Sequence, residues 1–83
     1  MAYKLLYSKH ALRDIKKLDL VVKKKIEKKI PQFSKRPVFN ARKIINSRAG
    51  QYRWRIGDYR VIFDISHNNI YILHIGHRRE IYR

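Results

Sequence analysis

Apolar and polar residues alternate most clearly in the segment 51–63. The run Tyr-Arg-Trp-Arg-Ile at residues 52–56 has the period of two that predicts a strand with one buried face. Gly57 and Asp58 are turn residues, and a second β-branched and aromatic run follows over residues 59–65. The pattern therefore predicts a β-hairpin with a two-residue loop.

This loop fixes which residues lie opposite one another in the hairpin. The predicted pairs are Ile56 with Tyr59, Arg55 with Arg60, Trp54 with Val61 and Arg53 with Ile62. Arg53, Arg55 and Arg60 then share one face, called the arginine face below, and the apolar residues share the other. Like charges directly across two strands are destabilising, so three clustered guanidinium groups favour an anion-binding face over an ordinary solvated one.

A short strand and two helices are predicted before the hairpin. Residues 3–7 predict a short strand, and Ser8 can cap a helix whose apolar positions are 11, 12, 15 and 18. Asp19 can cap a second helix with an apolar stripe at positions 22, 26, 30 and 33. Pro31 is expected to end or kink this second helix, because proline removes an amide donor. The short link predicts a helical hairpin packed on a sheet.

Residues 34–50 show no clear period and predict an irregular connection. The apolar residues expected to anchor this connection to the core are Val38, Phe39, Ile44 and Ile45.

A turn at residues 66–69 precedes a last strand over residues 70–75, with two possible registers. A three-residue loop at 67–69 would pair residues 71, 73 and 75 with 65, 63 and 61, placing His74 on the arginine face. A two-residue loop at 68–69 would instead place His77 opposite Arg60 and His74 in the core. We favour the first, because it buries the bulkier set of residues.

The element order is one strand, two helices and three strands. It predicts an α+β fold: a small twisted, mainly antiparallel sheet with the N-terminal helical hairpin packed on one face. The other face is expected to stay open and to carry the arginines. With 83 residues, the chain 1–83 is expected to form a single domain.

The charge balance points to an anionic partner. The chain has 21 Lys and Arg residues against 6 Asp and Glu, a net charge of +15. Such a charge favours binding to nucleic acid or to an acidic protein, and the sequence fits a membrane surface less well. No cysteine is present, and no apolar run approaches the roughly 18 residues of a membrane-spanning helix, so we expect a cytoplasmic protein.

The predicted second helix is rich in lysine. Its basic face is either an ordinary solvated surface or a docking surface for RNA phosphate or an acidic partner. The residues predicted to bind RNA are Lys24, Lys25, Lys28, Arg42, Lys43, Arg48 and Arg79.

The arginines also suggest phosphate chemistry. The residues predicted to form the catalytic site are Arg53, Arg55, Arg60, Arg78, Tyr82 and His77, with His74 as an alternative to His77. Arginine bonds two phosphate oxygens at once, and it would stabilise the extra charge of a pentacovalent transition state. RNA brings its own nucleophile, the ribose 2′-hydroxyl. Tyr82 and a histidine are the plausible proton carriers, although either side chain could have a purely structural role.

The sequence lacks the residue patterns that metal, cofactor and serine-nucleophile sites require. The four histidines are dispersed and have no metal-ligand spacing, so no metal is expected. A phosphate-binding glycine loop, a dinucleotide motif and a serine nucleophile motif are all missing, so no cofactor is expected.

The segments 52–63 and 75–82 resemble the RelE branch of the RelE/ParE toxin superfamily. The first contains Gly-Asp-Tyr-Arg-Val and the second reads Ile-Gly-His-Arg-Arg-Glu-Ile-Tyr, and the resemblance spans nearly the whole chain. It implies the toxin of a type II toxin–antitoxin pair, a ribosome-dependent endoribonuclease that cuts mRNA in the A site. The implied partners are the ribosome with its rRNA, mRNA and an acidic antitoxin, and oligomers would form only through the antitoxin complex.

The resemblance also implies roles for single residues. Arg53 and Arg55 fall where some members have lysines, one of them proposed as a base. Arg60 and Arg78 match arginines assigned to transition-state stabilisation or leaving-group protonation, and Tyr82 matches a tyrosine that orients or stacks on substrate. The two lysine-to-arginine differences leave the base to Tyr82, His77 or the ribosome. A ParE-like inhibitor of DNA gyrase and a non-catalytic RNA-binding module are the alternative functions.

Overall fold

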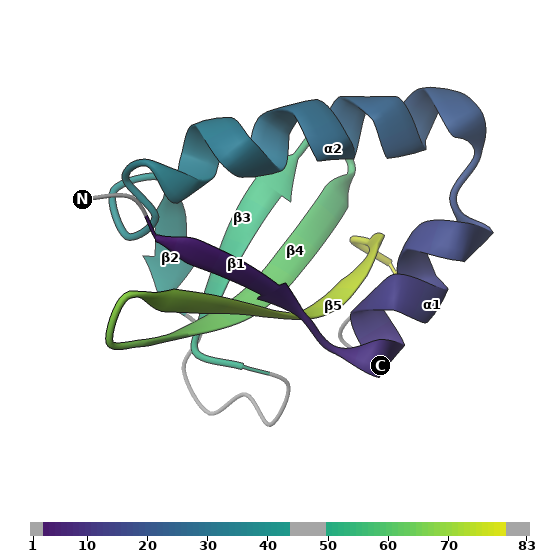
Figure 1. The fold of residues 1–83 in the computed structure, drawn as a ribbon. Coiled ribbons are helices and arrows are strands. Elements are labelled where there is room, and N and C mark those ends of the chain that lie inside the picture. The colour runs from purple at the N-terminus through teal and green to yellow at the C-terminus, as the bar shows by residue number, and fades with distance from the viewer. Residues whose placement is uncertain (1–2, 44–49, 80–83) are drawn as a thin grey trace.

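The strands form one mixed sheet, and α2 lies across one of its faces (Figure 1). The computed structural model describes residues 3–43 and 50–79. Within them the elements are β1 (Lys4–Tyr7), α1 (Lys9–Lys17), α2 (Leu20–Ser34), β2 (Ala41–Lys43), β3 (Tyr52–Ile56), β4 (Tyr59–Ser66) and β5 (Asn69–His77). The strand order is β1-β5-β4-β3-β2, with β1 parallel to β5 and the other pairs antiparallel. The predicted α+β fold is confirmed.

Side chains cap both helices at the predicted residues. The Ser8 hydroxyl accepts a hydrogen bond from the Ala11 amide at 3.0 Å, and Asp19 Oδ1 accepts from the Val22 amide at 2.9 Å. Each cap satisfies an amide that has no partner within its own helix. Ser8 also donates to the Leu73 carbonyl of β5 at 2.9 Å, so one hydroxyl both starts α1 and attaches it to the sheet.

Pro31 was predicted to end or kink α2, and it does not end the helix. The helix continues to Ser34, whose hydroxyl donates to the Pro31 carbonyl at 2.8 Å. Proline removes one helical hydrogen bond, and here it does so in the last turn, where few bonds remain to be broken. Ile30, which is 1% exposed, and Phe33 pack in the core on either side of Pro31 and hold this turn in place.

The β3–β4 hairpin has the predicted register throughout. Its pairs are Ile56 with Tyr59, Arg55 with Arg60, Trp54 with Val61 and Arg53 with Ile62. Gly57 has a φ of 60°, a conformation that glycine adopts without the steric cost of a side chain. The two-residue loop therefore sets the whole hairpin.

A β-bulge in β5 makes the favoured register correct for only part of the strand, because the predicted pairs of Ile65 with Tyr71 and of Phe63 with Leu73 do not occur. The turn occupies His67 and Asn68, so Ser66 pairs with Asn69 and Phe63 with Ile72. The register then shifts by one residue between Ile62 and Phe63. Beyond it Val61 pairs with Ile75, as in the favoured three-residue register, whereas the alternative register occurs nowhere. The extra residue lets Leu73 and His74 both lie opposite Ile62.

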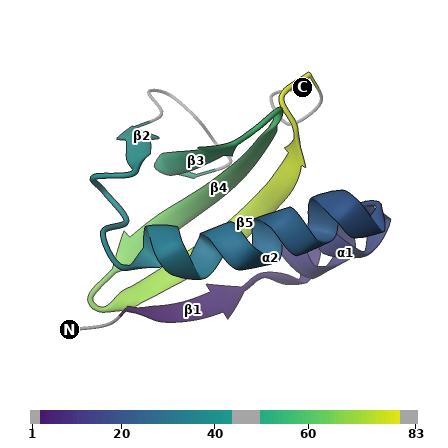
Figure 2. The same ribbon diagram turned by 90° about the horizontal axis from the view of Figure 1, so that it is seen from above.

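The core lies between α2 and the facing side of the sheet (Figures 1 and 2). Trp54 is 0% exposed at its centre, with ring centroids 4.1 Å from Phe63 and 5.9 Å from Phe33. Its indole Nε1 donates to the buried Pro37 carbonyl at 3.1 Å.

The connection between α2 and β3 differs from its prediction. Residues 41–43 form β2 and pair with β3, which the sequence did not indicate. Val38 and Phe39 are 54% and 73% exposed, so they do not anchor this segment to the core. Pro37 and Ala41 anchor this segment instead. The indole of Trp54 donates to the Pro37 carbonyl, and Ala41 packs against the core. Ile44 and Ile45 lie outside the described residues.

The face of the sheet away from α2 is less open than predicted. Ile62 is 0% exposed although it lies on the arginine face. Gly50 lies so close that a Cβ there would be 2.7 Å from Ile62 Cγ2 and 3.1 Å from Leu73 Cδ1. The backbone at Gly50 therefore covers this part of the arginine face.

Replacing Ser8 by alanine is expected to lower the free energy of unfolding by about 2 kcal/mol, because both the cap and the bond to Leu73 are lost. Asp19→Ala removes a cap alone and should cost about 1 kcal/mol. Urea denaturation of the two variants measures the difference. Equal losses would mean that the bond between Ser8 and Leu73 contributes nothing to stability.

Candidate functional site

Four arginines gather on the arginine face as two cross-strand pairs. Arg55 of β3 lies opposite Arg60 of β4, and Arg53 of β3 lies opposite Arg42 of β2. Arg42 was predicted only as an RNA-binding residue, and the pairing of β2 places it beside the predicted catalytic arginines. Like charges in directly opposed positions destabilise a sheet, and a bound anion would relieve this repulsion.

The arginines differ in how firmly they are held. Arg60 is only 8% exposed, and its Nη1 donates to the carbonyls of Gly57 at 3.3 Å and Tyr59 at 3.2 Å. Arg53 is half-buried and Arg55 is exposed. The exposed guanidinium of Arg55 is suited to capturing a phosphate, and the buried, hydrogen-bonded guanidinium of Arg60 is suited to orienting it.

The tip of the hairpin brings in two further cations. The Arg78 amide donates to the Asp58 carbonyl at 2.8 Å, which ties the end of β5 to the β3–β4 turn. Lys25 of α2 approaches the same turn, because a Cβ on Gly57 would lie 3.2 Å from Lys25 Nζ. The turn at Gly57 and Asp58 is thus the point where α2, the hairpin and the end of β5 meet. The sequence predicted that Arg78 would lie near the hairpin arginines, but it did not predict that Lys25 would approach this turn.

His77 does not join the arginine face. It lies opposite Tyr59, and the two rings meet edge to face with centroids 5.4 Å apart. Tyr59 packs against the core on the side of α2, so its partner His77 lies on that side too. His77 Nδ1 accepts a hydrogen bond from the Arg79 amide at 3.2 Å, which leaves Nε2 as the protonated nitrogen of the neutral ring.

Of the other predicted RNA-binding residues, the described lysines of α2 lie apart from these arginines. Lys24 and Lys28 are exposed on α2, across the sheet from the arginine face, and Arg79 is exposed beside Arg78. Lys43 pairs with Tyr52 through the backbone. Arg48 and Tyr82 lie outside the described residues.

Sequence reasoning missed a contact between α1 and β5. His10 Nδ1 lies 3.0 Å from both Asp14 Oδ2 and His74 Nδ1. Burial lowers the pKa of His74, proximity to His10 lowers it further, and Asp14 partly opposes both effects. The spacing of His10 and Asp14 by one helical turn was visible in the sequence, whereas the approach of His74 joins residues that are 64 positions apart.

No helix in the described parts of the chain is long and apolar enough to cross a membrane.

The fold resembles those of solved RelE toxins. The first is in the toxin–antitoxin complex RelBE2 from Mycobacterium tuberculosis, with 25% identity, a TM-score of 0.84 and coverage of 94% of this chain and 100% of the other. The second is in the RelE–RelB complex from Pyrococcus horikoshii, with 23% identity, a TM-score of 0.76 and coverage of 96% and 99%. The third is in the intact RelBE complex of E. coli, with 20% identity, a TM-score of 0.73 and coverage of 92% and 96%.

Two sequence comparisons, with curated proteins and with protein families, give different results. None of the curated proteins compared with the chain matches it significantly. The family described as the ParE toxin of the type II toxin–antitoxin system parDE matches residues 5–82. The chain therefore belongs to the RelE/ParE family and is a toxin of a type II toxin–antitoxin system.

Proposed function

We propose that this toxin is a ribosome-dependent endoribonuclease that cleaves mRNA in the A site. The observation that carries the proposal is the two pairs of opposed arginines on adjacent strands, Arg55 with Arg60 and Arg42 with Arg53. Two like-charged pairs on one face cost stability, and they are useful where a polyanion runs across that face. The bond from the Arg78 amide to the Asp58 carbonyl adds a further arginine beside the same hairpin.

Cleavage would proceed by attack of the ribose 2′-oxygen on the adjacent phosphorus. The 2′-O–P bond forms as the P–O5′ bond breaks, leaving a 2′,3′-cyclic phosphate and a 5′-hydroxyl. One proton leaves the 2′-hydroxyl and one reaches the departing O5′. Arg60 and Arg78 stabilise the charge that develops on the phosphate, while Arg42, Arg53 and Arg55 bind and orient the RNA strand.

Proton transfer requires a group other than these arginines, because a guanidinium stays protonated at cellular pH. The sequence offers three candidates for this role: Tyr82, His77 and, as the alternative to His77, His74. The Nδ1 atom of His74 already contacts Nδ1 of His10 on α1 at 3.0 Å, which leaves Tyr82 and His77. The side chain of His77 lies on the side of Tyr59, across the sheet from the arginine face. This separation favours Tyr82, and we assign the role to it.

The partner that neutralises the toxin is proposed to be an acidic antitoxin. The three solved relatives are complexes of RelE with RelB. The exposed lysines of α2, including Lys24 and Lys28, supply complementary charge for an acidic chain. An enzyme that acts on translating ribosomes would work in the cytoplasm.

Mapping of transcript ends after induction of the toxin tests the proposal. Primer extension should find new 5′ ends in phase with codons, and only in messages that are being translated. Arg78→Ala should remove most of these ends, because a side chain at the hairpin tip is lost while the backbone bond to Asp58 can remain. Arg13→Ala, which removes one exposed positive charge from α1, is the matched control and should cleave like the wild type.

The second candidate function is ParE-like inhibition of DNA gyrase, and the family description that matches residues 5–82 favours it. A gyrase inhibitor would block DNA supercoiling in a purified assay and leave transcripts intact. Intact transcripts together with blocked supercoiling would therefore overturn the nuclease proposal. Salt-sensitive RNA binding without cleavage would instead identify a non-catalytic RNA-binding module.

A further inference from the structure

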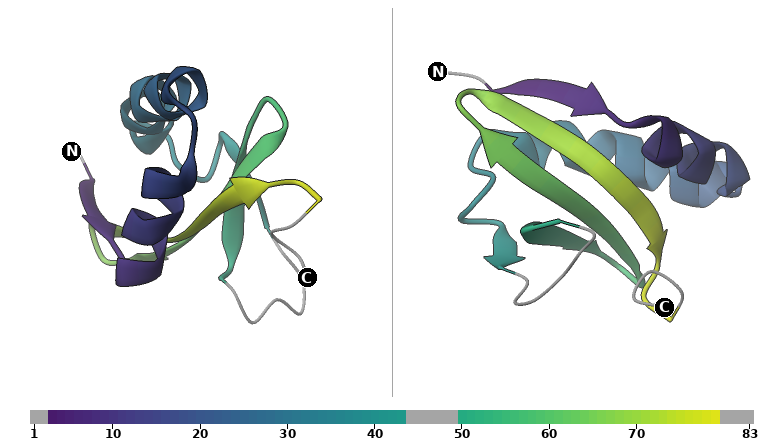
Figure 3. Two further views of the ribbon diagram at one scale, coloured as in Figure 1. Left: turned by 90° about the vertical axis from the view of Figure 1, so that its right-hand side faces the viewer. Right: turned by 90° about the horizontal axis from the view of Figure 1, so that it is seen from below.

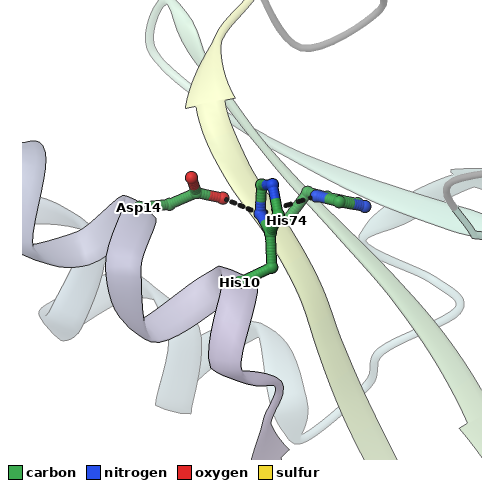
Figure 4. A group of neighbouring side chains, drawn as sticks. All are labelled: His10, Asp14 and His74. Carbon is green, nitrogen blue, oxygen red and sulfur yellow. Dashed lines mark hydrogen bonds and ion pairs between the residues drawn. The ribbon is translucent and has the colours of Figure 1, made fainter.

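α1 packs beside β5 (Figure 3), and three side chains of metal-ligand type from these two elements meet there (Figure 4). His10 and Asp14 lie one turn apart on α1, and His74 comes from β5, 64 residues away from His10. His10 Nδ1 is 3.0 Å from Asp14 Oδ2 and 3.0 Å from His74 Nδ1. Ligand atoms of all three residues lie within 4.8 Å of one another.

The fold holds this cluster in place through bonds outside it. Asp14 Oδ2 accepts a hydrogen bond from the Ile75 amide at 3.0 Å, which fixes the carboxylate against β5. The Ser8 hydroxyl donates to the Leu73 carbonyl at 2.9 Å and fixes the start of α1 against the same strand. Such outer bonds orient the ligands of metal sites in proteins.

A single proton cannot satisfy the three facing atoms equally. Nδ1 of a neutral imidazole is either a donor or an acceptor. A proton on His10 Nδ1 must be shared between Asp14 and His74. A proton on His74 Nδ1 would leave the lone pair of His10 facing the carboxylate oxygen at 3.0 Å. A cation among the three atoms would accept a lone pair from each of them.

We propose that His10, Asp14 and His74 form a binding site for a divalent transition-metal ion, with Zn²⁺ the best fit. Two imidazole nitrogens and one carboxylate oxygen are a ligand set that suits this ion. Zinc bonds of about 2.0–2.1 Å in a tetrahedral arrangement separate two ligand atoms by about 3.3–3.4 Å. The two separations of 3.0 Å would need to open by a few tenths of an ångström, and a wider separation, of up to 4.8 Å, would need to close toward the same value.

The ion would join α1 to β5, and its fourth position would take a water molecule. The side chain of His10 is 60% exposed, so solvent reaches the cluster, while that of Asp14 is 15% exposed. An ion that binds the folded chain and not the unfolded chain stabilises the fold by mass action. The proposed ribonuclease mechanism gives no role to these three residues, so the metal site can be tested independently.

The test uses the full chain, stripped with chelator and carrying no histidine tag. Titration with ZnCl₂ against a coloured chelator should show one saturable site per chain. The melting temperature should rise by about 10 °C or more when free Zn²⁺ exceeds its Kd a hundredfold or so. Long-range ¹H–¹⁵N spectra should show Zn²⁺-dependent shifts at Nδ1 of His10 and His74.

The variants His10→Ala and His74→Gln should each weaken binding by more than about 100-fold, beyond what loss of an outer partner costs. His67→Asn is the matched control, because His67 lies in the exposed β4–β5 turn with a φ of 57° that asparagine tolerates. This control should bind Zn²⁺ like the wild type. The proposal is overturned if no saturable binding occurs, if the His10→Ala/His74→Gln double variant still binds, or if His67→Asn abolishes binding.

Discussion

Replacing Arg60 by alanine is expected to slow mRNA cleavage by about 100- to 1000-fold, the usual effect of losing one donor that stabilises a developing oxyanion. Arg60 is the most buried of the four arginines, at 8% exposed, and its guanidinium donates to the carbonyls of Gly57 and Tyr59. A guanidinium held before substrate arrives needs no reorganisation in the transition state. Primer extension in a translating extract, with purified toxin at a fixed concentration, measures the rate.

Arg60→Lys distinguishes charge from geometry. Lysine keeps the positive charge but cannot bond two phosphate oxygens through a planar fork, so it should restore only a small part of the rate. Thermal unfolding of both variants shows whether the fold survives. Wild-type cleavage by a folded Arg60→Ala variant would remove this residue from the site.

Trp54→Ala is expected to cause the largest loss of stability, about 3–5 kcal/mol from the lost apolar contacts. Trp54 is 0% exposed and contacts the rings of Phe63 and Phe33. The substitution also deprives the buried Pro37 carbonyl of its donor, at a further cost of about 1–3 kcal/mol. A small domain has only about 5–15 kcal/mol to lose, so the urea midpoint should fall steeply or the chain should not fold.

Trp54→Phe separates the two contributions, because phenylalanine fills part of the space but has no N–H donor. It should be less damaging than alanine and still less stable than the wild type. Tyr71→Ala, at a position 37% exposed on the other face of the sheet, is the control and should change stability by less than about 1 kcal/mol. A Trp54→Ala variant as stable as this control would mean that the indole does not organise the core.

The features that the sequence predicted correctly depend on short-range geometry. A two-residue loop leaves a hairpin one register, so Gly57 and Asp58 determine every pair from Ile56 with Tyr59 onwards. Ser8 and Asp19 cap helices through amides only three residues away. The shared face of Arg53, Arg55 and Arg60 follows from the same alternation, and their placement could be read directly from the sequence.

The features that could not be predicted depend on contacts between distant segments. The bulge leaves both Leu73 and His74 opposite Ile62, which breaks the period of two on which register arguments rest. The pairing of Arg42 with Arg53 requires β2, a three-residue strand too short to show a period. The approach of His10 to His74 spans 64 residues, so ligand spacing along the chain was no guide to it.

The position of β5 between β1 and β4 has a consequence for how the protein is made. Chains emerge from N-terminus to C-terminus at about 5–20 residues per second. β5, which pairs with β1 and packs against α1, is synthesised after all the other described strands. An incomplete nascent chain therefore lacks the scaffold for its own first elements, and the sheet that carries the arginines cannot close before β5 has been released.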